Sequence, residues 1–160
     1  MATARSKSHQ PAEIRLTVVG FQNVLDDKST CRNTGYALKL LKRHPLVYIK
    51  KGLIHVRAPG ATIQFTIASS REDKANYFPA AITFVRESDC NTSDEQRLGL
   101  LNFPQRRTRV IEKTISITDT YRDRKEVIKY KFSVIIQRGS DGAIGVIDPG
   151  IVHDGSDIRN

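Results

Sequence analysis

The segment from Glu126 to Gln137 limits the fold of this chain more than any other segment. An apolar residue stands at every second position: Ile128, Tyr130, Phe132, Val134 and Ile136. Lys129, Lys131, Ser133 and Gln137 occupy positions between them. Because successive side chains of a strand point to opposite faces, this pattern predicts a half-buried β-strand with its lysines in water.

Shorter segments have the same alternation. Strands are predicted at Ile14–Phe21, Leu46–Lys50, Leu53–Arg57, Thr62–Ala68, Ala80–Val85 and Val110–Ile117, with Ile111, Ile115 and Ile117 facing inward in the last. A tight turn or a bulge is expected at Lys50-Lys51-Gly52. A hairpin loop is expected at Gly139–Gly142, with Ala143–Ile147 returning beside the long strand. Beyond Pro149 the chain becomes polar apart from Ile151 and Val152, and it is expected to fray.

Two segments favour short helices. Gly35–His44 has Thr34 as a capping residue and ends before Pro45, which disfavours helical geometry at the preceding residue. Ser93, with Gln96 three residues later, resembles a capping box for one helical turn.

Seven or eight short strands without crossover helices predict a mostly β protein. The expected fold is an antiparallel, immunoglobulin-like β-sandwich with one or two short helices, and a small β-barrel is the alternative. Residues 14–152 are predicted to form this single domain. Residues 1–13 are expected to be a flexible basic N-terminus, and residues 153–160 a flexible C-terminal tail.

The composition is that of a folded protein with a basic surface. The 160 residues are 39% hydrophobic, and the formal net charge is +9. No apolar run approaches the roughly 20 residues of a membrane helix, and no secretory signal is recognisable, so we expect a soluble cytoplasmic protein without a membrane partner. Cys31 and Cys90 fit no metal or redox motif. A disulfide between them stays open, although a reducing compartment favours two free thiols.

Two stretches carry a family resemblance. Val56–Ile67 contains a turn followed by Gly-Ala-Thr-Ile-Gln-Phe, and the C-terminal hairpin is followed by Asp148-Pro149-Gly150-Ile151. Together they resemble the bacterial DP-EP family of small immunoglobulin-like sandwiches. The Glu-Pro dipeptide of that family is missing here, and His153-Asp154-Gly155 stands nearby instead. The resemblance implies a sandwich fold and no particular activity.

Catalytic and metal-binding patterns are weak. Of the four histidines, His9, His44, His55 and His153, only the last stands beside acids, so that a hard cation could be held by His153, Asp148, Asp154 and Asp157 if the tail folds back. A polar, frayed tail explains the same residues. No nucleophile elbow or phosphate-binding loop is present. The sequence therefore predicts a protein that is not an enzyme, with no catalytic residue, metal or other cofactor.

Clusters of basic residues are the remaining candidate site. The residues considered for anion or nucleic-acid contacts are Lys39, Lys42, Arg43, Lys50, Lys51, Arg106, Arg107, Arg109, Lys129 and Lys131. If they converge, they form a stripe able to follow a phosphate backbone. Single-strand binders also need exposed rings for base stacking, and Tyr36, Tyr48, Tyr77 and Tyr121 are available.

These observations favour a non-enzymatic binding or interaction module, whose partner is a protein or a second copy of the chain. One alternative is a non-specific nucleic-acid-binding protein that uses its basic surface. Another is a small viral coat-type structural protein, although its basic arm would be short, with only Arg5 and Lys7.

Overall fold

Most of the chain folds into strands that form two sheets. The computed structural model describes residues 10–25, 33–87, 93–120 and 127–153. The five-stranded sheet has the order β2-β1-β5-β8-β7. Its strands are β1 (Ala12–Val18), β2 (Tyr36–Leu40), β5 (Ala61–Ser69), β7 (Arg109–Ile111) and β8 (Thr114–Asp119).

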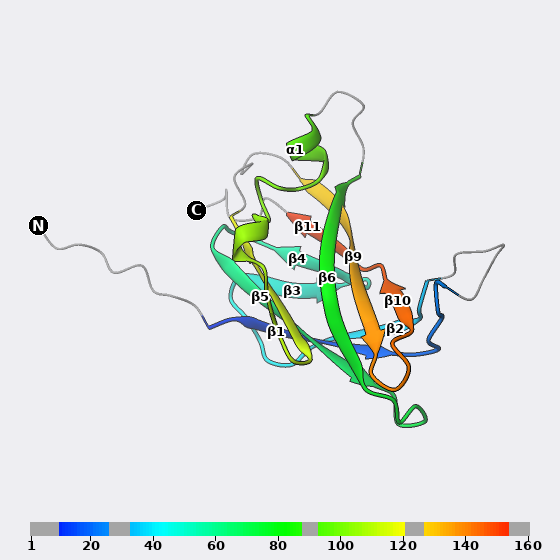
Figure 1. The fold of residues 1–160 in the computed structure, drawn as a ribbon. Coiled ribbons are helices and arrows are strands. Elements are labelled where there is room, and N and C mark those ends of the chain that lie inside the picture. The colour runs from blue at the N-terminus through cyan, green and yellow to red at the C-terminus, as the bar shows by residue number, and fades with distance from the viewer. Residues whose placement is uncertain (1–9, 26–32, 88–92, 121–126, 154–160) are drawn as a thin grey trace, which may run out of the picture.

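The six-stranded sheet is built around one long strand. It has the order β10-β9-β11-β4-β3, with β6 on the other side of β9. Its strands are β3 (Val47–Lys50), β4 (Leu53–Val56), β6 (Tyr77–Arg86), β9 (Ile128–Arg138), β10 (Ile144–Ile147) and β11 (Gly150–His153). In Figure 1, β6 and β9 run side by side along the molecule.

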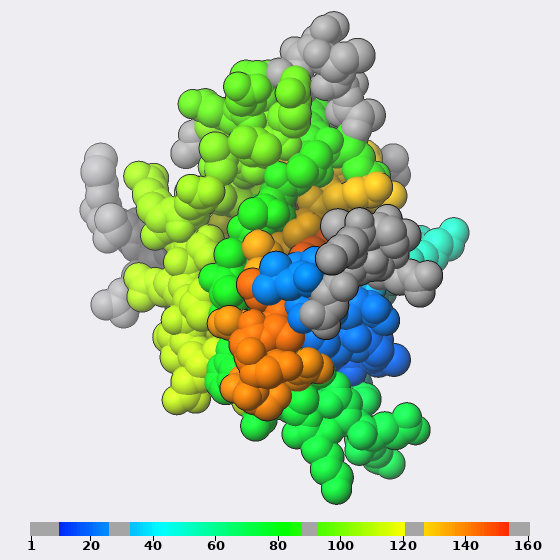
Figure 2. Space-filling view, turned by 45° about the vertical axis from the view of Figure 1, so that its right-hand side comes forward, coloured from blue at the N-terminus to red at the C-terminus, as the bar shows by residue number. Residues whose placement is uncertain are grey.

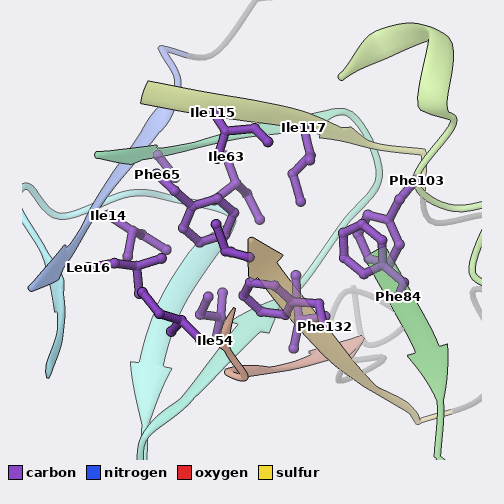
Figure 3. Packing of buried hydrophobic residues seen from close by; sticks show 14 of the residues in the cluster. Ile14, Leu16, Ile54, Ile63, Phe65, Phe84, Phe103, Ile115, Ile117 and Phe132 are labelled. Carbon is purple, nitrogen blue, oxygen red and sulfur yellow. The ribbon is translucent and has the colours of Figure 1, made fainter. Parts of the chain in front are cut away.

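The core lies between the two sheets. Ile14, Ile63, Phe65, Ile115 and Ile117 come from the five-stranded sheet, and Ile54, Phe84 and Phe132 come from the other sheet (Figure 3). The rings of Phe65 and Phe132 meet across the core at a centroid distance of 5.3 Å. Within the described residues the two sheets are hydrogen-bonded separately, so the expected alternative of one closed barrel is wrong.

The prediction of a purely antiparallel sandwich is also wrong, because each sheet contains one parallel pair. Strand β1 runs parallel to β5, and β11 runs parallel to β4. The remaining neighbours are antiparallel, including the β9–β10 hairpin. Alternation in a sequence reports which face is buried and does not distinguish the direction of the neighbouring strand.

The alternation of the long strand is confirmed. Ile128, Tyr130, Phe132, Val134 and Ile136 of β9 are buried. Lys129 and Lys131, between them, are exposed. The pattern thus identified both the strand and its register.

The predicted helix at Gly35–His44 is wrong. Residues 36–40 form strand β2, which pairs antiparallel with β1 so that Leu38 lies opposite Leu16. Tyr36, Leu38 and Leu40 pack against the core, while Ala37 and Lys39 are exposed. Pairing with β1 outweighs a helical propensity that is marginal over about ten residues.

The second expected helix is confirmed. Ser93 caps α1 (Asp94–Arg97), and its side chain accepts a hydrogen bond from the backbone N–H of Gln96. A 3₁₀ turn, η1 (Gln105–Arg107), follows and leads into β7. Segment 93–108 therefore connects the end of β6 to the edge of the other sheet.

Two predictions near turns are wrong. Ile111 is exposed, because Glu112 with its positive φ of 49° and Lys113 form a turn that divides the expected strand into β7 and β8. Ile151 and Val152 do not belong to a fraying end. They are buried in β11, which also contains His153. This strand lies between β9 and β4, where it forms hydrogen bonds on both sides.

Candidate nucleic-acid interface

The register of the six-stranded sheet brings basic and aromatic side chains into two rows on its outer face. In one row, Lys129 lies opposite Val152, Val152 opposite His55, and His55 opposite Tyr48. The next row contains Lys131, Gly150, Leu53 and Lys50 in the same order of strands. Each row crosses four strands, a span of about 14 Å at the usual strand spacing. We call this surface the outer face of the six-stranded sheet.

Two rings and a guanidinium group stack at the β3–β4 side of this face. The Tyr48 and His55 rings are nearly parallel, with centroids 4.8 Å apart and planes inclined by 18°. The Arg57 guanidinium carbon lies 4.6 Å from the centroid of the Tyr48 ring. Both rings are half-buried and Arg57 is exposed. Aromatic rings and guanidinium groups are the side chains on which nucleic-acid bases stack.

The lysines at the other side of the face share one carboxylate. The Nζ atom of Lys129 lies 3.1 Å from one carboxylate oxygen of Glu87, and the Nζ atom of Lys131 lies 3.7 Å from the other. The side chains of Lys129 and Lys131 are 45% and 72% exposed, so the ion pairs contribute little to stability. Glu87 holds the two cations side by side and neutralises part of their charge.

The structure divides the ten predicted basic residues among four places. Lys50, Lys51, Lys129 and Lys131 belong to the outer face of the six-stranded sheet or to its β3–β4 turn. Lys39 and Arg109 lie on the outer face of the five-stranded sheet. Lys42 and Arg43 are exposed between β2 and β3, and Arg106 and Arg107 are exposed in η1. The two rows therefore include neither Arg106 nor Arg107.

Sequence reasoning missed the contribution of His55 and Arg57. In the sequence, His55 stands apart from the other histidines and Arg57 stands outside the basic clusters. The signal that could have found them is the short hairpin, because a two-residue turn at Lys51-Gly52 places Tyr48 opposite His55. Of the other tyrosines, Tyr36 and Tyr77 pack against or within the core, and Tyr121 lies outside the described residues.

The outer face of the five-stranded sheet has a different chemistry. Hydroxyl and amide side chains fill its middle: Thr62, Gln64, Thr66, Thr114, Ser116 and Thr118. Arg15 and Lys39 are cross-strand neighbours at one side, and Arg109 lies at the other. A shallow hollow of about 300 Å³ lies beside Arg109, with Gln64 and Ser116 in its lining.

A buried polar cluster occupies one end of the core. The Nε2 atom of His153 lies 2.6 Å from a carboxylate oxygen of Asp119, and both side chains are fully buried. Next to them, Nδ2 of Asn102 donates a hydrogen bond of 2.8 Å to the Tyr130 hydroxyl. The Phe103 ring contacts both the His153 and the Tyr130 ring. An acid–base pair sealed in this way contacts no solvent, so we interpret it as a link between β8 and β11.

The predicted cation site at the tail is not assembled by the described residues. His153 lies against Asp119, and Asp148 instead accepts hydrogen bonds from Ser133 and Asn33. Asp154 and Asp157 lie outside the described residues, as do His9, Cys31 and Cys90. Among the residues that are described, no group of three or more histidine, cysteine, aspartate or glutamate side chains could hold a metal ion.

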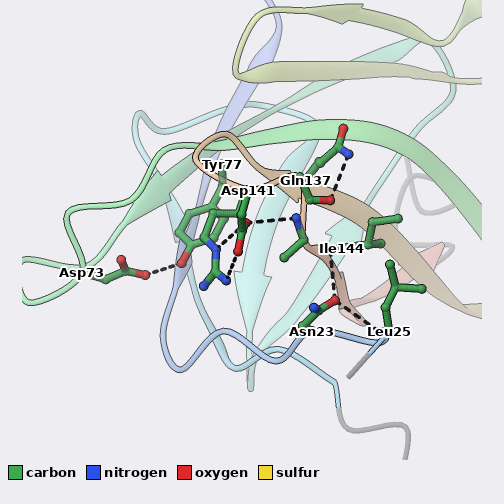
Figure 4. Close-up of polar contacts among 10 residues, drawn as sticks. Asn23, Leu25, Asp73, Tyr77, Gln137, Asp141 and Ile144 are labelled. Atoms are coloured by element: carbon green, nitrogen blue, oxygen red, sulfur yellow. Dashed lines mark hydrogen bonds and ion pairs between the residues drawn. The ribbon is translucent and has the colours of Figure 1, made fainter. Parts of the chain in front are cut away.

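A second polar network fastens the end of the β9–β10 hairpin. Asp141 accepts hydrogen bonds of 2.9 and 2.7 Å from the Arg138 guanidinium. These bonds, together with one from the backbone N–H of Ala143, lower the pKa of Asp141 to about 2. The Tyr77 hydroxyl donates to Asp73 (Figure 4). Burial, followed by this hydrogen bond, raises the pKa of Tyr77 to about 12.

The same network holds the segment that follows β1. The Phe21 ring stacks on Tyr77 at 5.2 Å, and the Arg138 guanidinium lies 4.7 Å from the Phe21 centroid. Asn23 accepts a hydrogen bond of 3.3 Å from the backbone N–H of Ile144. In Figure 2 the hairpin (orange) accordingly packs against the blue segment of residues 19–25. These contacts are structural and bring together no set of reactive groups.

Comparison with known proteins gives no family. No family model matches the chain, and no curated protein sequence is detectably similar to it. None of the helices in the described ranges has the length and apolar character needed to cross a membrane.

Proposed function

We propose that the protein is a non-enzymatic binding module that takes a single-stranded nucleic acid across the outer face of the six-stranded sheet. The observation that carries this proposal is the pair of rows that join Lys129 and Lys131 on β9 to Tyr48 and Lys50 on β3. Lysine and stacked planar groups on one sheet face are the two components that a sequence-tolerant single-strand binder combines.

Each component has a separate role in the proposed complex. Lys50, Lys51, Lys129 and Lys131 neutralise phosphates and release counterions, which gives affinity without reading bases. The stack of Tyr48, His55 and Arg57 receives an unpaired base. Duplex DNA buries its bases in the helix, so the stack favours single strands over duplexes of the same charge.

The proposal includes one further point, which concerns the fold class. We infer that the sandwich is of the immunoglobulin-like type, supported by the two packed sheets around a common core and by the resemblance of residues 56–67 and 148–151 to the DP-EP family. This point is not needed for the binding proposal.

A titration with matched double variants tests the proposal. The probe is a fluorescently labelled oligothymidine of about 20 nucleotides, followed by anisotropy at about 50 mM salt and again at about 200 mM. The variant Lys129→Glu/Lys131→Glu reverses two charges on the proposed face. The control Arg15→Glu/Lys39→Glu reverses two neighbouring charges on the outer face of the five-stranded sheet. Both change the net charge equally, so non-specific attraction to the whole molecule cancels.

We expect the wild type to bind and to lose affinity strongly with salt. The Lys129→Glu/Lys131→Glu variant should bind at least about tenfold more weakly than the control variant, because it removes two phosphate contacts and repels the chain. If both double variants lose the same amount of affinity, the outer face of the six-stranded sheet is not the binding site. An absence of binding by the wild type at micromolar protein and low salt would refute the function.

A further inference from the structure

The edge strand β7 exposes apolar side chains that no described strand covers. The five-stranded sheet ends at β7, which pairs with β8 on one side. Val110 is 46% exposed and Ile111 is 69% exposed. An exposed strand edge presents backbone N–H and C=O groups that can pair with another extended segment. This edge is therefore available, within the described structure, to a further strand.

An apolar notch lies next to this edge, between β6 and the segment that leads into β7. It has a volume of about 130 Å³ and is bordered by β6, by the segment after α1 and by the residues that lead into β7. Its lining consists of Ile82, Thr83, Phe84, Leu98, Leu100, Phe103, Gln105 and Thr108. Val110 lies opposite the buried Ile115, so it faces the space between the sheets, on the side of the notch. A segment paired with β7 would direct every second side chain toward that space.

The charge around the edge is mostly positive. Between Gln105 and Lys113 the sequence contains Arg106, Arg107, Arg109 and Lys113, against Glu112 as the single carboxylate. Arg106, Arg107 and Arg109 are exposed. Arg109 and Ile111 face the outer side of the sheet, opposite to Val110. An added strand therefore encounters the apolar Val110 on the inner side, and Arg109 together with Ile111 on the outer side.

We propose that β7 is a docking edge for an acidic, extended peptide segment of a partner protein. The peptide adds a strand beside Arg109–Ile111, places aliphatic side chains next to Val110 and over the notch, and places carboxylates next to Arg107 and Arg109. Main-chain hydrogen bonds supply affinity, while the alternation of aliphatic and acidic residues supplies specificity. This site is separate from the outer face of the six-stranded sheet and does not depend on the function proposed for it.

The test uses a short synthetic peptide in which glutamate and valine alternate, labelled with fluorescein and followed by polarisation. We expect saturable binding at low salt. The Arg107→Glu/Arg109→Glu variant and the Val110→Lys variant should each bind about tenfold more weakly, since each removes one component of the site. The Arg15→Glu/Lys39→Glu variant is the matched control and should bind as the wild type does. All substituted side chains are exposed, and a thermal melt confirms that each variant folds.

Three outcomes would overturn the proposal. The first is an absence of binding by the wild type. The second is equal binding of a peptide with lysine in place of glutamate, which would mean non-specific adhesion to apolar surface. The third is a concentration-dependent dimer, detected by sedimentation and abolished by Val110→Lys, which would assign the edge to a second copy of this chain. Loss of peptide binding in Val110→Lys with a monomeric wild type supports the proposal.

Discussion

The outer faces of the two sheets have the same backbone pattern and present different chemistry to water. The six-stranded sheet presents Tyr48, Lys50, His55, Lys129 and Lys131, whereas the five-stranded sheet presents mainly threonine, serine and glutamine. Both sheets use their inner positions for aliphatic and aromatic side chains of the same core. Burial constrains one side of most strands, whereas in β11 Ile151 and Val152 are buried on both sides. Elsewhere the outward positions can differ between the sheets, and that difference supports the functional proposal.

The largest expected effect concerns the inner positions, where the two sheets should behave alike. Phe132→Ala and Phe65→Ala each remove a ring of one contacting pair, and each should lower the free energy of unfolding by about 3–5 kcal/mol. Lys131→Ala, on the outer side of the same strand as Phe132, should change it by less than about 0.5 kcal/mol. Urea denaturation measures all three. A harmless Phe132→Ala would mean that the inner and outer faces have been assigned incorrectly.

The next largest effect is a loss of oligonucleotide binding, and it should appear only for changes on the outer face of the six-stranded sheet. Tyr48→Ala removes the ring that stacks with His55 and Arg57, and it should weaken binding of the labelled oligothymidine by about 1–3 kcal/mol. Tyr48→Phe keeps the ring and should bind nearly as well as the wild type. Thr66→Ala, on the outer face of the five-stranded sheet, is the control and should have no effect. If Tyr48→Phe also abolishes binding, the ring does not act by stacking.

Replacing Glu87 should strengthen oligonucleotide binding, and by less than the loss expected for Tyr48→Ala. Glu87→Gln releases Lys129 and Lys131 from their shared carboxylate, so oligonucleotide affinity should rise by up to about 1 kcal/mol. Glu13→Gln makes the same change beside Gln64 on the other outer face, and its effect should be smaller. Anisotropy titrations of the two variants give the comparison directly. An equal rise in both would indicate an effect of net charge rather than of the Glu87 site.

The smallest effect concerns pH and the β9–β10 hairpin. Arg138 lowers the pKa of Asp141 to about 2, from an ordinary value of 3.8 for aspartate. The Asp141–Arg138 pair therefore contributes its full stability above pH 3.8 and loses it as pH falls toward 2. The melting temperature of the wild type should therefore approach that of Asp141→Asn over this interval. Circular dichroism melts between pH 2 and 5 test this. A constant difference between the two proteins across the interval would contradict it. Binding to the two faces should accordingly be compared above pH 4.

Sequence alone predicted the elements whose signal is local. The alternation from Ile128 to Ile136 gave the correct strand and the correct inner side chains. Ser93 and Gln96 gave the correct cap, because a capping hydrogen bond joins residues three apart. The Gly139–Gly142 loop and its returning strand were also correct, since a hairpin needs only its own residues.

The errors occurred where a distant partner decides the outcome. Residues 36–40 are a strand because β1 pairs with them, and Thr34 and Pro45 give no sign of that partner. Ile151 and Val152 are buried because β4 and β9 lie on either side. For the candidate site, the sequence shows that Lys50 and Lys129 are basic, yet their shared face depends on the insertion of β11 between β4 and β9.

The insertion of β11 also sets an order of events in folding. Ile54 pairs with Ile151, so most of the chain must be synthesised before this contact can form. In the folded sheet, β11 alone joins the hairpin of β3 and β4 to the ribbon of β6, β9 and β10 within the described residues. Joining two such pieces through a strand of high sequence separation carries a large loop-closure entropy and slows folding. A nascent chain that stops before Gly150 would expose the edges of both pieces, which makes this step the one most open to aggregation.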